Sequence, residues 1–283
     1  MTASPEIHGH GGTERLHEVH YDPDPVIRHP RRLIAEISRD LHTSVELAWR
    51  LFLRDLKARY RQSLLGYVWA ILPPLAVTLT FVFINRHGIL ELEGELMAFP
   101  YPVFVFTGTM LWQVFVDAIN APLKLLTTYR GLLVKINFPR EALILAGIGE
   151  VLFNLAIRLV LAGAVLLYFQ VPLPPSALLV PLGVVGLLGL GLLIGIVLAP
   201  LGVLYTDVQH SLTILVSMWF FLTPVVYAPR TGETAELLGL VNPVTPLLVT
   251  SREWLLAGSA TGIQSFTVVL VVTLALLVFG WLF

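Results

Sequence analysis

The stretch from Val45 to Val82 constrains this chain most, because it joins a charged amphipathic segment to a long apolar run. At helical spacing, the apolar face is formed by Val45, Ala48, Trp49, Phe52 and Leu56. The opposite face is formed by Glu46, Arg50, Arg54, Lys57 and Arg61. The apolar run that follows has roughly 20 residues, enough to cross a hydrocarbon core of about 30 Å. We therefore predict a helix on the membrane surface, followed by one that crosses it.

The composition extends this prediction to the whole chain of 283 residues. Hydrophobic residues make up 56% of it and charged residues only 13%, with a mean hydropathy of +0.79. Soluble domains carry about a quarter charged residues. We therefore expect an all-α integral membrane protein.

Basic residues are segregated along the sequence, which predicts an orientation. All but four of the lysines and arginines lie in residues 1–65 and 119–140, and the exceptions are Arg86, Arg158, Arg230 and Arg252. Cationic segments beside membrane spans stay on the cytoplasmic side. We therefore expect a protein of the cytoplasmic (inner) membrane, with both basic segments and both termini on the cytoplasmic side. We expect no nucleic-acid partner.

The sequence divides into three parts. Residues 1–30 are expected to form a flexible cytoplasmic tail, residues 31–62 amphipathic interface helices, and residues 63–283 a permease domain. Histidines in the tail match no defined metal site, so no metal is predicted; they are His8, His10, His17 and His20. Without cysteine the chain has no disulfide or thiolate chemistry. The first 60 residues contain no apolar segment of the kind found in a cleavable signal peptide.

Six spans are expected in the permease domain, at about 66–85, 98–119, 141–169, 177–200, 211–227 and 263–283. Residues 237–257 are too short to cross twice and contain Pro243 and Pro246, which favours a re-entrant or interfacial hairpin. The fourth span is rich in glycine, and packing within one subunit is the favoured explanation. Its glycines are Gly183, Gly186, Gly189, Gly191 and Gly195.

Five blocks of the chain together resemble a known family. They are RDLKARYRQSLLGYVWAILPPL (54–75), PYPVFVFTGTMLWQVF (100–115), LLVKINFPRE (132–141), LYTDVQHSLTILVSMWFFLTPVVY (204–227) and VNPVTPLL (241–248). As a set they resemble the permease subunits of type-2 ABC exporters for O-antigen, capsular polysaccharide and teichoic acid. The resemblance covers most of the chain.

This resemblance implies a homodimeric channel that exports a polyprenyl-linked polysaccharide. It also implies an interface helix within Leu33–Arg61, a coupling helix at Leu126–Asn137, and a gate between the fifth and sixth spans. The residues expected at the gate are Asn242, Pro243 and Pro246.

ATP hydrolysis is expected on a separate subunit. Phosphate-binding loops need a lysine preceded by glycine, and none of the three lysines, Lys57, Lys124 and Lys135, has one. We therefore expect a non-catalytic permease with no cofactor of its own, whose partner ATPase binds ATP and Mg²⁺. The residues expected to contact the ATPase are Tyr129, Arg130, Gly131 and Leu132. The alternative is a basic loop whose side chains reach toward lipid head groups and bind no partner.

Basic residues of the interface segment are candidates for binding lipid phosphates. They are Arg50, Arg54, Lys57, Arg59 and Arg61. Arg59 lies near the apolar face and is suited either to a polyprenyl-pyrophosphate carrier or to simple head-group anchoring.

Polar and aromatic residues in the spans are candidates for lining the channel. Glu150, Asn154 and Arg158 follow one another at four-residue steps, either as a hydrated path or as a structural ion pair, whereas Asp117 and Glu141 are expected at the membrane interface. Aromatic rings provide either a sliding surface for sugars or ordinary packing. The aromatic candidates are Trp69, Phe81, Trp112, Phe115, Trp219, Phe220 and Phe221.

Three other functions remain open from sequence. A permease for a drug or small lipid is the nearest alternative, and a non-transporting scaffold is another. A membrane-embedded glycosyl or acyl transferase would need converging carboxylates and histidines, whereas His87 and His210 are isolated on opposite sides.

Overall fold

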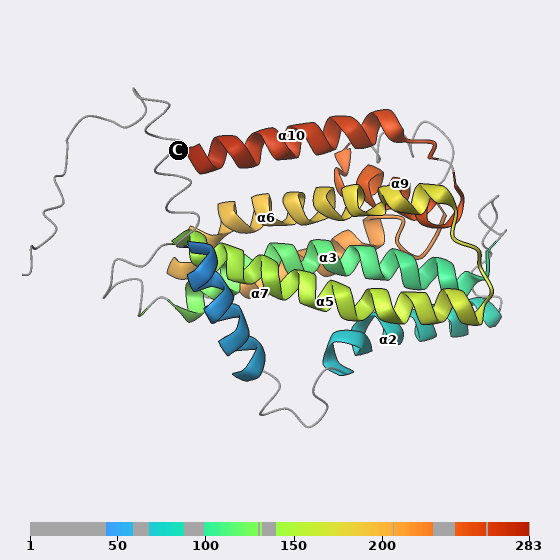
Figure 1. The fold of residues 1–283 in the computed structure, drawn as a ribbon, viewed down its shortest axis with the longest axis horizontal. Coiled ribbons are helices and arrows are strands. Elements are labelled where there is room, and N and C mark those ends of the chain that lie inside the picture. The colour runs from blue at the N-terminus through green and yellow to red at the C-terminus, as the bar shows by residue number, and fades with distance from the viewer. Residues whose placement is uncertain are drawn as a thin grey trace, which may run out of the picture. The chain divides into compact units, whose positions relative to one another are not determined.

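The described part of the chain is helical. A computed structural model describes residues 44–58, 68–87, 99–129, 131, 140–205, 207–228, 241–258 and 260–282, and these ranges contain no strand. After a helix over residues 44–58 come α2 (Val68–Arg86), α3 (Tyr101–Thr128), α5 (Arg140–Tyr168), the 3-10 helix η3 (Pro175–Leu179), α6 (Val180–Leu204), α7 (Asp207–Leu222), α9 (Val244–Leu256) and α10 (Ile263–Leu282) (Figure 1). The expected tail and the first short amphipathic helix lie outside these ranges.

Within the described residues, four segments are long and apolar enough to cross a membrane, as in a multi-pass membrane protein. They lie in α3, α5, η3 with α6, and α10. The other two expected spans correspond to α2, with 19 residues, and to α7, with 16 residues, about 24 Å at the helical rise.

Helix α3 lies at the centre of the packing. Within its apolar stretch 78% of the residues are buried, against 17% for α10. It contacts α6, α5, α2, α9 and α7, and Figure 1 shows α10 running along α6 at the margin of these helices. A span so enclosed makes its contacts mostly with protein, whereas α10 has most of its surface available for lipid or for another subunit.

Helices α3 and α6 pack side by side and run in the same direction, so their ends define two ends of the described helices. We call them the Tyr101 end and the Tyr129 end, after the residues that flank or begin α3. The start of α6 meets α9 at the Tyr101 end, where Gly183 approaches Ser251. Its last turn lies at the Tyr129 end, where Gly202 approaches Leu123.

Close backbone packing holds α6 on α3. A Cβ atom at Gly195 would lie 2.4 Å from the Ile119 carbonyl oxygen, and one at Gly191 would lie 2.7 Å from that of Phe115. No side chain fits at these distances, so glycine is required for the two backbones to approach. The expectation that these glycines pack helices within one subunit is confirmed.

The second span is longer than expected. Helix α3 continues past residue 119 to Thr128, so residues 126–128 of the expected coupling helix belong to α3. Polar side chains within this extension bond to its own backbone, as Asn120 Nδ2 does to the Val116 carbonyl and Thr127 Oγ1 to that of Leu123, both at 2.8 Å. Of residues 129–137, only Tyr129 and Gly131 are described.

Helix α9 is a short element between α7 and α10. Its 13 residues are about 20 Å long, less than a membrane core, and most of them are buried. It packs on α6, α10, η3 and α3. A re-entrant or interfacial hairpin of two short helices was expected at residues 237–257, whereas residues 244–256 form one continuous helix. Residues 229–240, which include the start of the expected hairpin, lie outside the described residues.

Substituting Gly195 by alanine should destabilise the fold. The added Cβ must push Ile119 away, and overpacking of this kind costs about 1 to 3 kcal/mol, partly offset by the better helix propensity of alanine. We expect a lower Tm for the detergent-purified protein.

The matched control is Gly163→Ala in α5, where a Cβ has no neighbour within 4 Å. Its Tm should equal or slightly exceed that of the parent protein. Equal Tm values for the two variants would contradict the packing described for α3 and α6.

Candidate functional site

The helix over residues 44–58 packs on the Tyr129 end of the bundle. Ala48 and Leu51 are buried in a cluster with residues from the end of α3 and the start of α5, namely Leu125, Ala142, Leu143 and Ala146. Two members of the expected apolar face point elsewhere, since Val45 is 51% exposed and Trp49 is 58% exposed. The apolar surface is therefore divided, with Ala48 and Leu51 against protein and Trp49 available for lipid.

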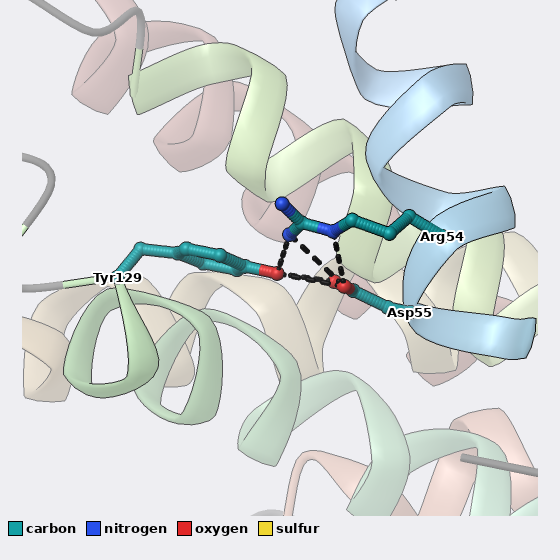
Figure 2. Close-up of polar contacts among 3 residues, drawn as sticks. All are labelled: Arg54, Asp55 and Tyr129. Carbon is teal, nitrogen blue, oxygen red and sulfur yellow. Dashed lines mark hydrogen bonds and ion pairs between the residues drawn. The ribbon is translucent and has the colours of Figure 1, made fainter. Parts of the chain in front are cut away.

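A compact polar cluster joins this helix to α3 (Figure 2). The Tyr129 hydroxyl donates to the Asp55 carboxylate, with both oxygens 2.7 Å away, and accepts from Arg54 Nη2. Arg54 Nε and Nη2 also lie 3.1 and 3.0 Å from Asp55 Oδ1. The Arg54 guanidinium lies 5.1 Å from the centre of the Tyr129 ring. Each charge in the cluster thus has an opposite charge or a hydroxyl as partner.

The protonation of Tyr129 suits this arrangement. Burial of the ring, and then the adjacent Asp55 carboxylate, raise the pKa of Tyr129 to about 12. The phenol therefore keeps its proton at neutral pH and donates to Asp55. The interaction attaches the helix over residues 44–58 to Tyr129, the first residue of the segment expected to contact the ATPase.

A second ion pair lies beside this cluster. Lys124 Nζ on α3 is 3.2 Å from Glu150 Oε1 on α5. A small pocket opens here between the helix over residues 44–58, α3 and α5. It is lined by Phe52, Asp55, Leu56, Leu125, Ala146 and Glu150.

Deeper along α3 and α5, a buried ion pair joins the two helices. Arg158 Nη1 lies 2.8 Å from Asp117 Oδ2, and Asn154 Nδ2 donates to the same oxygen over 3.3 Å. Arg158 is almost fully buried. Asp117 therefore pairs with Arg158 between two helices. Glu150, Asn154 and Arg158, which were expected to share one face of the span, therefore belong to two ion pairs, because Glu150 bonds to Lys124 and Arg158 bonds to Asp117. Breaking a buried pair of this kind typically costs about 3 to 5 kcal/mol.

The aromatic candidates form one packed cluster in the described residues. Trp112 and Phe115 are 3% and 0% exposed, and Phe115 meets Trp219 at 5.3 Å between ring centres. Phe220 packs on Trp112. Only Phe221 has most of its surface free, at 65% exposed, and the side chain of Trp69 lies outside the described residues. Burial of this extent favours a packing role for Trp112 and Phe115 within the subunit.

Asn242 connects the start of α9 to α7. Its Nδ2 donates to Thr223 Oγ1 over 2.9 Å, and its Oδ1 accepts from Trp219 Nε1 over 2.9 Å. The same Oδ1 accepts from the Val244 backbone N–H at the beginning of α9. Pro243 immediately precedes α9, so two of the three expected gate residues, Asn242 and Pro243, lie where the start of α9 contacts the end of α7.

Arg252 on α9 is fully buried near the Tyr101 end. Its Nη1 donates to the Val225 carbonyl over 3.0 Å, and its guanidinium carbon lies 3.8 Å from the centre of the Phe104 ring. A hydrogen bond from a charged donor stabilises by about 1.5 to 3 kcal/mol, and a desolvated cation–π contact by about 2. Burying an ion costs several kcal/mol even after relaxation, so the penalty is of the same size as the gain from these contacts.

The remaining expected site residues lie apart from these clusters. Arg50 pairs with Glu46 at 2.7 Å, and both are exposed. Lys57 and Gly131 are also exposed, whereas Arg59, Arg61, Arg130 and Leu132 lie outside the described residues. Phe81 is half buried and faces Phe220, and Pro246 is buried within α9.

The sequence interpretation did not single out two residues that make central contacts in these clusters, Asp55 and Arg252. Asp55 lies between basic neighbours, so the pattern reported only a basic face. Arg252 was counted merely as one of the dispersed arginines, although a charge inside a short apolar helix is itself a signal of function.

The described residues give no support to a catalytic or metal centre. No group of three or more histidine, aspartate or glutamate side chains in these ranges has a geometry that could hold a metal ion. His87 bonds to the Phe83 carbonyl of its own helix, while His210 lies at the start of α7.

Several helices long and apolar enough to cross a membrane, with the helix over residues 44–58 attached to one end by polar contacts, define a multi-pass membrane protein. Residues 46–256 match the model of the ABC-2 type transporter family, and the chain belongs to that family. It is 32% identical to the O-antigen export system permease protein RfbA of Myxococcus xanthus over 221 residues, 74% of this chain and 80% of that protein.

Two further relatives extend this comparison. The O-antigen export system permease protein RfbA of Klebsiella pneumoniae is 24% identical, covering 80% of this chain and 88% of its own length. The polysialic acid transport protein KpsM of Escherichia coli is 25% identical, covering 81% and 89%. The resemblance found in the sequence blocks is therefore confirmed.

Removing the Tyr129 hydroxyl should loosen the helix over residues 44–58. A cysteine introduced at Leu51, which is 8% exposed, should react slowly with a thiol reagent in the parent protein. With Tyr129→Phe the helix loses about 1 kcal/mol, and the reaction should become about fivefold faster. The chain has no cysteine of its own, so only the introduced thiol is measured.

Tyr205→Phe is the matched control, because Tyr205 is 64% exposed at the end of α6. This variant should leave the labelling rate of the cysteine unchanged. A rate unaffected by Tyr129→Phe would show that the cluster in Figure 2 does not hold the helix.

Proposed function

We propose that this chain is the transmembrane subunit of an ABC exporter for lipid-linked polysaccharide in the cytoplasmic membrane. The observation that carries the proposal is the set of relatives. Proteins named for export of O-antigen and of polysialic acid match over most of their own lengths. These are two different glycans, so what the relatives share is transport of a sugar polymer.

In this proposal two copies of the chain form the conduit, and each crosses the membrane six times with both termini inside. Helices α2 and α7 are the other two crossings in this proposal. Most of α7 is exposed in the single subunit, with only Leu212 and Val216 buried. A face of this kind is suited to meet lipid or a second copy.

The motor in this proposal is a separate ATPase, which supplies ATP and Mg²⁺. It docks at the Tyr129 end through Tyr129, Arg130, Gly131 and Leu132. The cluster of Arg54, Asp55 and Tyr129 supports this placement, because a push on the segment after α3 reaches the helix over residues 44–58 through direct hydrogen bonds. Basic residues of that helix would contact lipid phosphates, which include the pyrophosphate of a polyprenyl carrier.

Deleting the gene should trap polymer inside the cell. We expect lipid-linked glycan to accumulate on the inner side of the membrane and surface glycan to disappear, since synthesis continues without export. Extraction of the lipid-linked fraction, together with surface staining, measures both quantities. Re-expression of the chain should restore the surface glycan.

Pull-down of the tagged protein provides the matching biochemical control, and should recover an ABC ATPase in equal copy number. Normal surface glycan in the deletion strain would contradict the proposed substrate. Increased retention of a drug or a small lipid in that strain would favour the nearest alternative.

A further inference from the structure

The position of α9 depends on a cation that is only partly satisfied. Arg252 is 0% exposed and makes one hydrogen bond, from Nη1 to the Val225 carbonyl just after α7. Its guanidinium also stacks over Phe104 on α3. Gly108 makes room for this meeting, because a Cβ there would lie 2.2 Å from the Val225 oxygen and 3.1 Å from Arg252 Nη1. The side chain of Arg252 therefore connects α9 to α3 and to the turn after α7.

Much of the hydrogen-bonding capacity of this guanidinium is unused. Arg252 Nε and Nη2 are buried without a hydrogen-bond partner in the part of the chain that the structure describes. The neighbouring Glu253 directs its carboxylate to Thr261 instead, with Oε2 accepting from the backbone N–H and Oε1 from the hydroxyl, both at 2.9 Å. A buried charge with unmet donors disfavours the arrangement that buries it, relative to one in which water reaches the charge.

We propose that Arg252 makes the packed position of α9 metastable, so that α9 separates from α3 and from the end of α7 during transport. The guanidinium then becomes hydrated or meets the polar groups of the passing polymer. This inference rests on the proposed export function, and it identifies Arg252 as a positioning residue for opening at the Tyr101 end.

Helix α7 is placed to start this movement. It runs from the Tyr129 end to the turn that carries Val225, and it holds α9 at two points, through Arg252 and through Asn242. A small displacement of that turn removes the one hydrogen bond of a guanidinium whose other contacts do not offset its burial. The separation of α9 would follow because the charge gains solvation.

A purely structural clamp would respond to mutation in the opposite direction. If Arg252 only fastened α9, an apolar replacement would lower the Tm and let small solutes leak. If Arg252 destabilises the packed position, Arg252→Met removes the desolvated charge and keeps much of the side-chain length. The packed position then becomes more stable, and opening becomes rarer.

The experiment uses the whole chain assembled with its ATPase in proteoliposomes. For Arg252→Met we expect a higher Tm and at least a tenfold loss of ATP-dependent export. Arg252→Lys keeps the charge and should retain more export than the methionine variant. Arg86→Met, at an exposed arginine in the last turn of α2, should behave as the parent protein.

Thiol labelling provides a second measurement that does not depend on the substrate. Val249 on α9 is 9% exposed, so a cysteine there should react with a water-soluble reagent only while ATP is being hydrolysed. In the Arg252→Met background this ATP-dependent labelling should be lost. A cysteine at Val241, which is 81% exposed, should react under all conditions.

A lower Tm, failure of Arg252→Met to accumulate in the membrane, or parental export by that variant would overturn the proposal. So would ATP-dependent labelling at Val249→Cys that persists after Arg252→Met. If the parent exports no polysaccharide but its Val249→Cys variant is labelled only with ATP, and this depends on Arg252, the proposed substrate fails and the role of Arg252 stands.

Discussion

The structure depends on burying one helix almost completely in surroundings that supply no water. Helix α3 can be buried there because its polar side chains donate hydrogen bonds to its own backbone. Thr107 donates to the Val103 carbonyl and Thr109 to the Val105 carbonyl, each over 2.8 Å. The glycines of α6 then bring a second backbone into direct contact with it.

The two ends of α3 use charge in opposite ways. At the Tyr129 end every charged group of the cluster has a partner, and the result is a firm attachment of the surface helix. At the Tyr101 end, Arg252 Nε and Nη2 are buried without a hydrogen-bond partner among the described residues, and we propose that this makes the attachment of α9 metastable. In the proposed exporter, α3 and α6 form a rigid pair. It connects the Arg54–Asp55–Tyr129 cluster, on the side of the ATPase, to the contacts of Arg252 on α9 at the other end.

The sequence predicted where helices occur better than how their side chains pair. Apolar runs and basic segments follow from the membrane as solvent, so the positions of α5, α6 and α10 could be predicted closely. Four-residue spacing showed that Glu150, Asn154 and Arg158 share a face, but it could not show which residue of α3 each would meet. Asp117 was therefore assigned to the interface, whereas it pairs with Arg158.

Other differences arose because tertiary contacts override local patterns. The end of α3 was expected near residue 119, since residues 120–140 are basic and too polar to cross a membrane. Buried packing and the bonds of Asn120 and Thr127 to the backbone continue the helix to Thr128. The helix over residues 44–58 was assigned one apolar face directed at lipid, but the ends of α3 and α5 cover Leu51 and leave Trp49 exposed.

The most direct test of this account is the distance between spin labels on α3 and α6 during turnover. Labels at Thr128→Cys and Leu182→Cys, two exposed positions near opposite ends of the pair, would be measured by pulsed electron paramagnetic resonance in the complex with its ATPase. The account predicts the same distance without nucleotide and with ATP trapped, because the glycine contacts hold the pair rigid. A change of several ångströms would contradict it, since α3 and α6 would then slide past each other and could not connect the two ends.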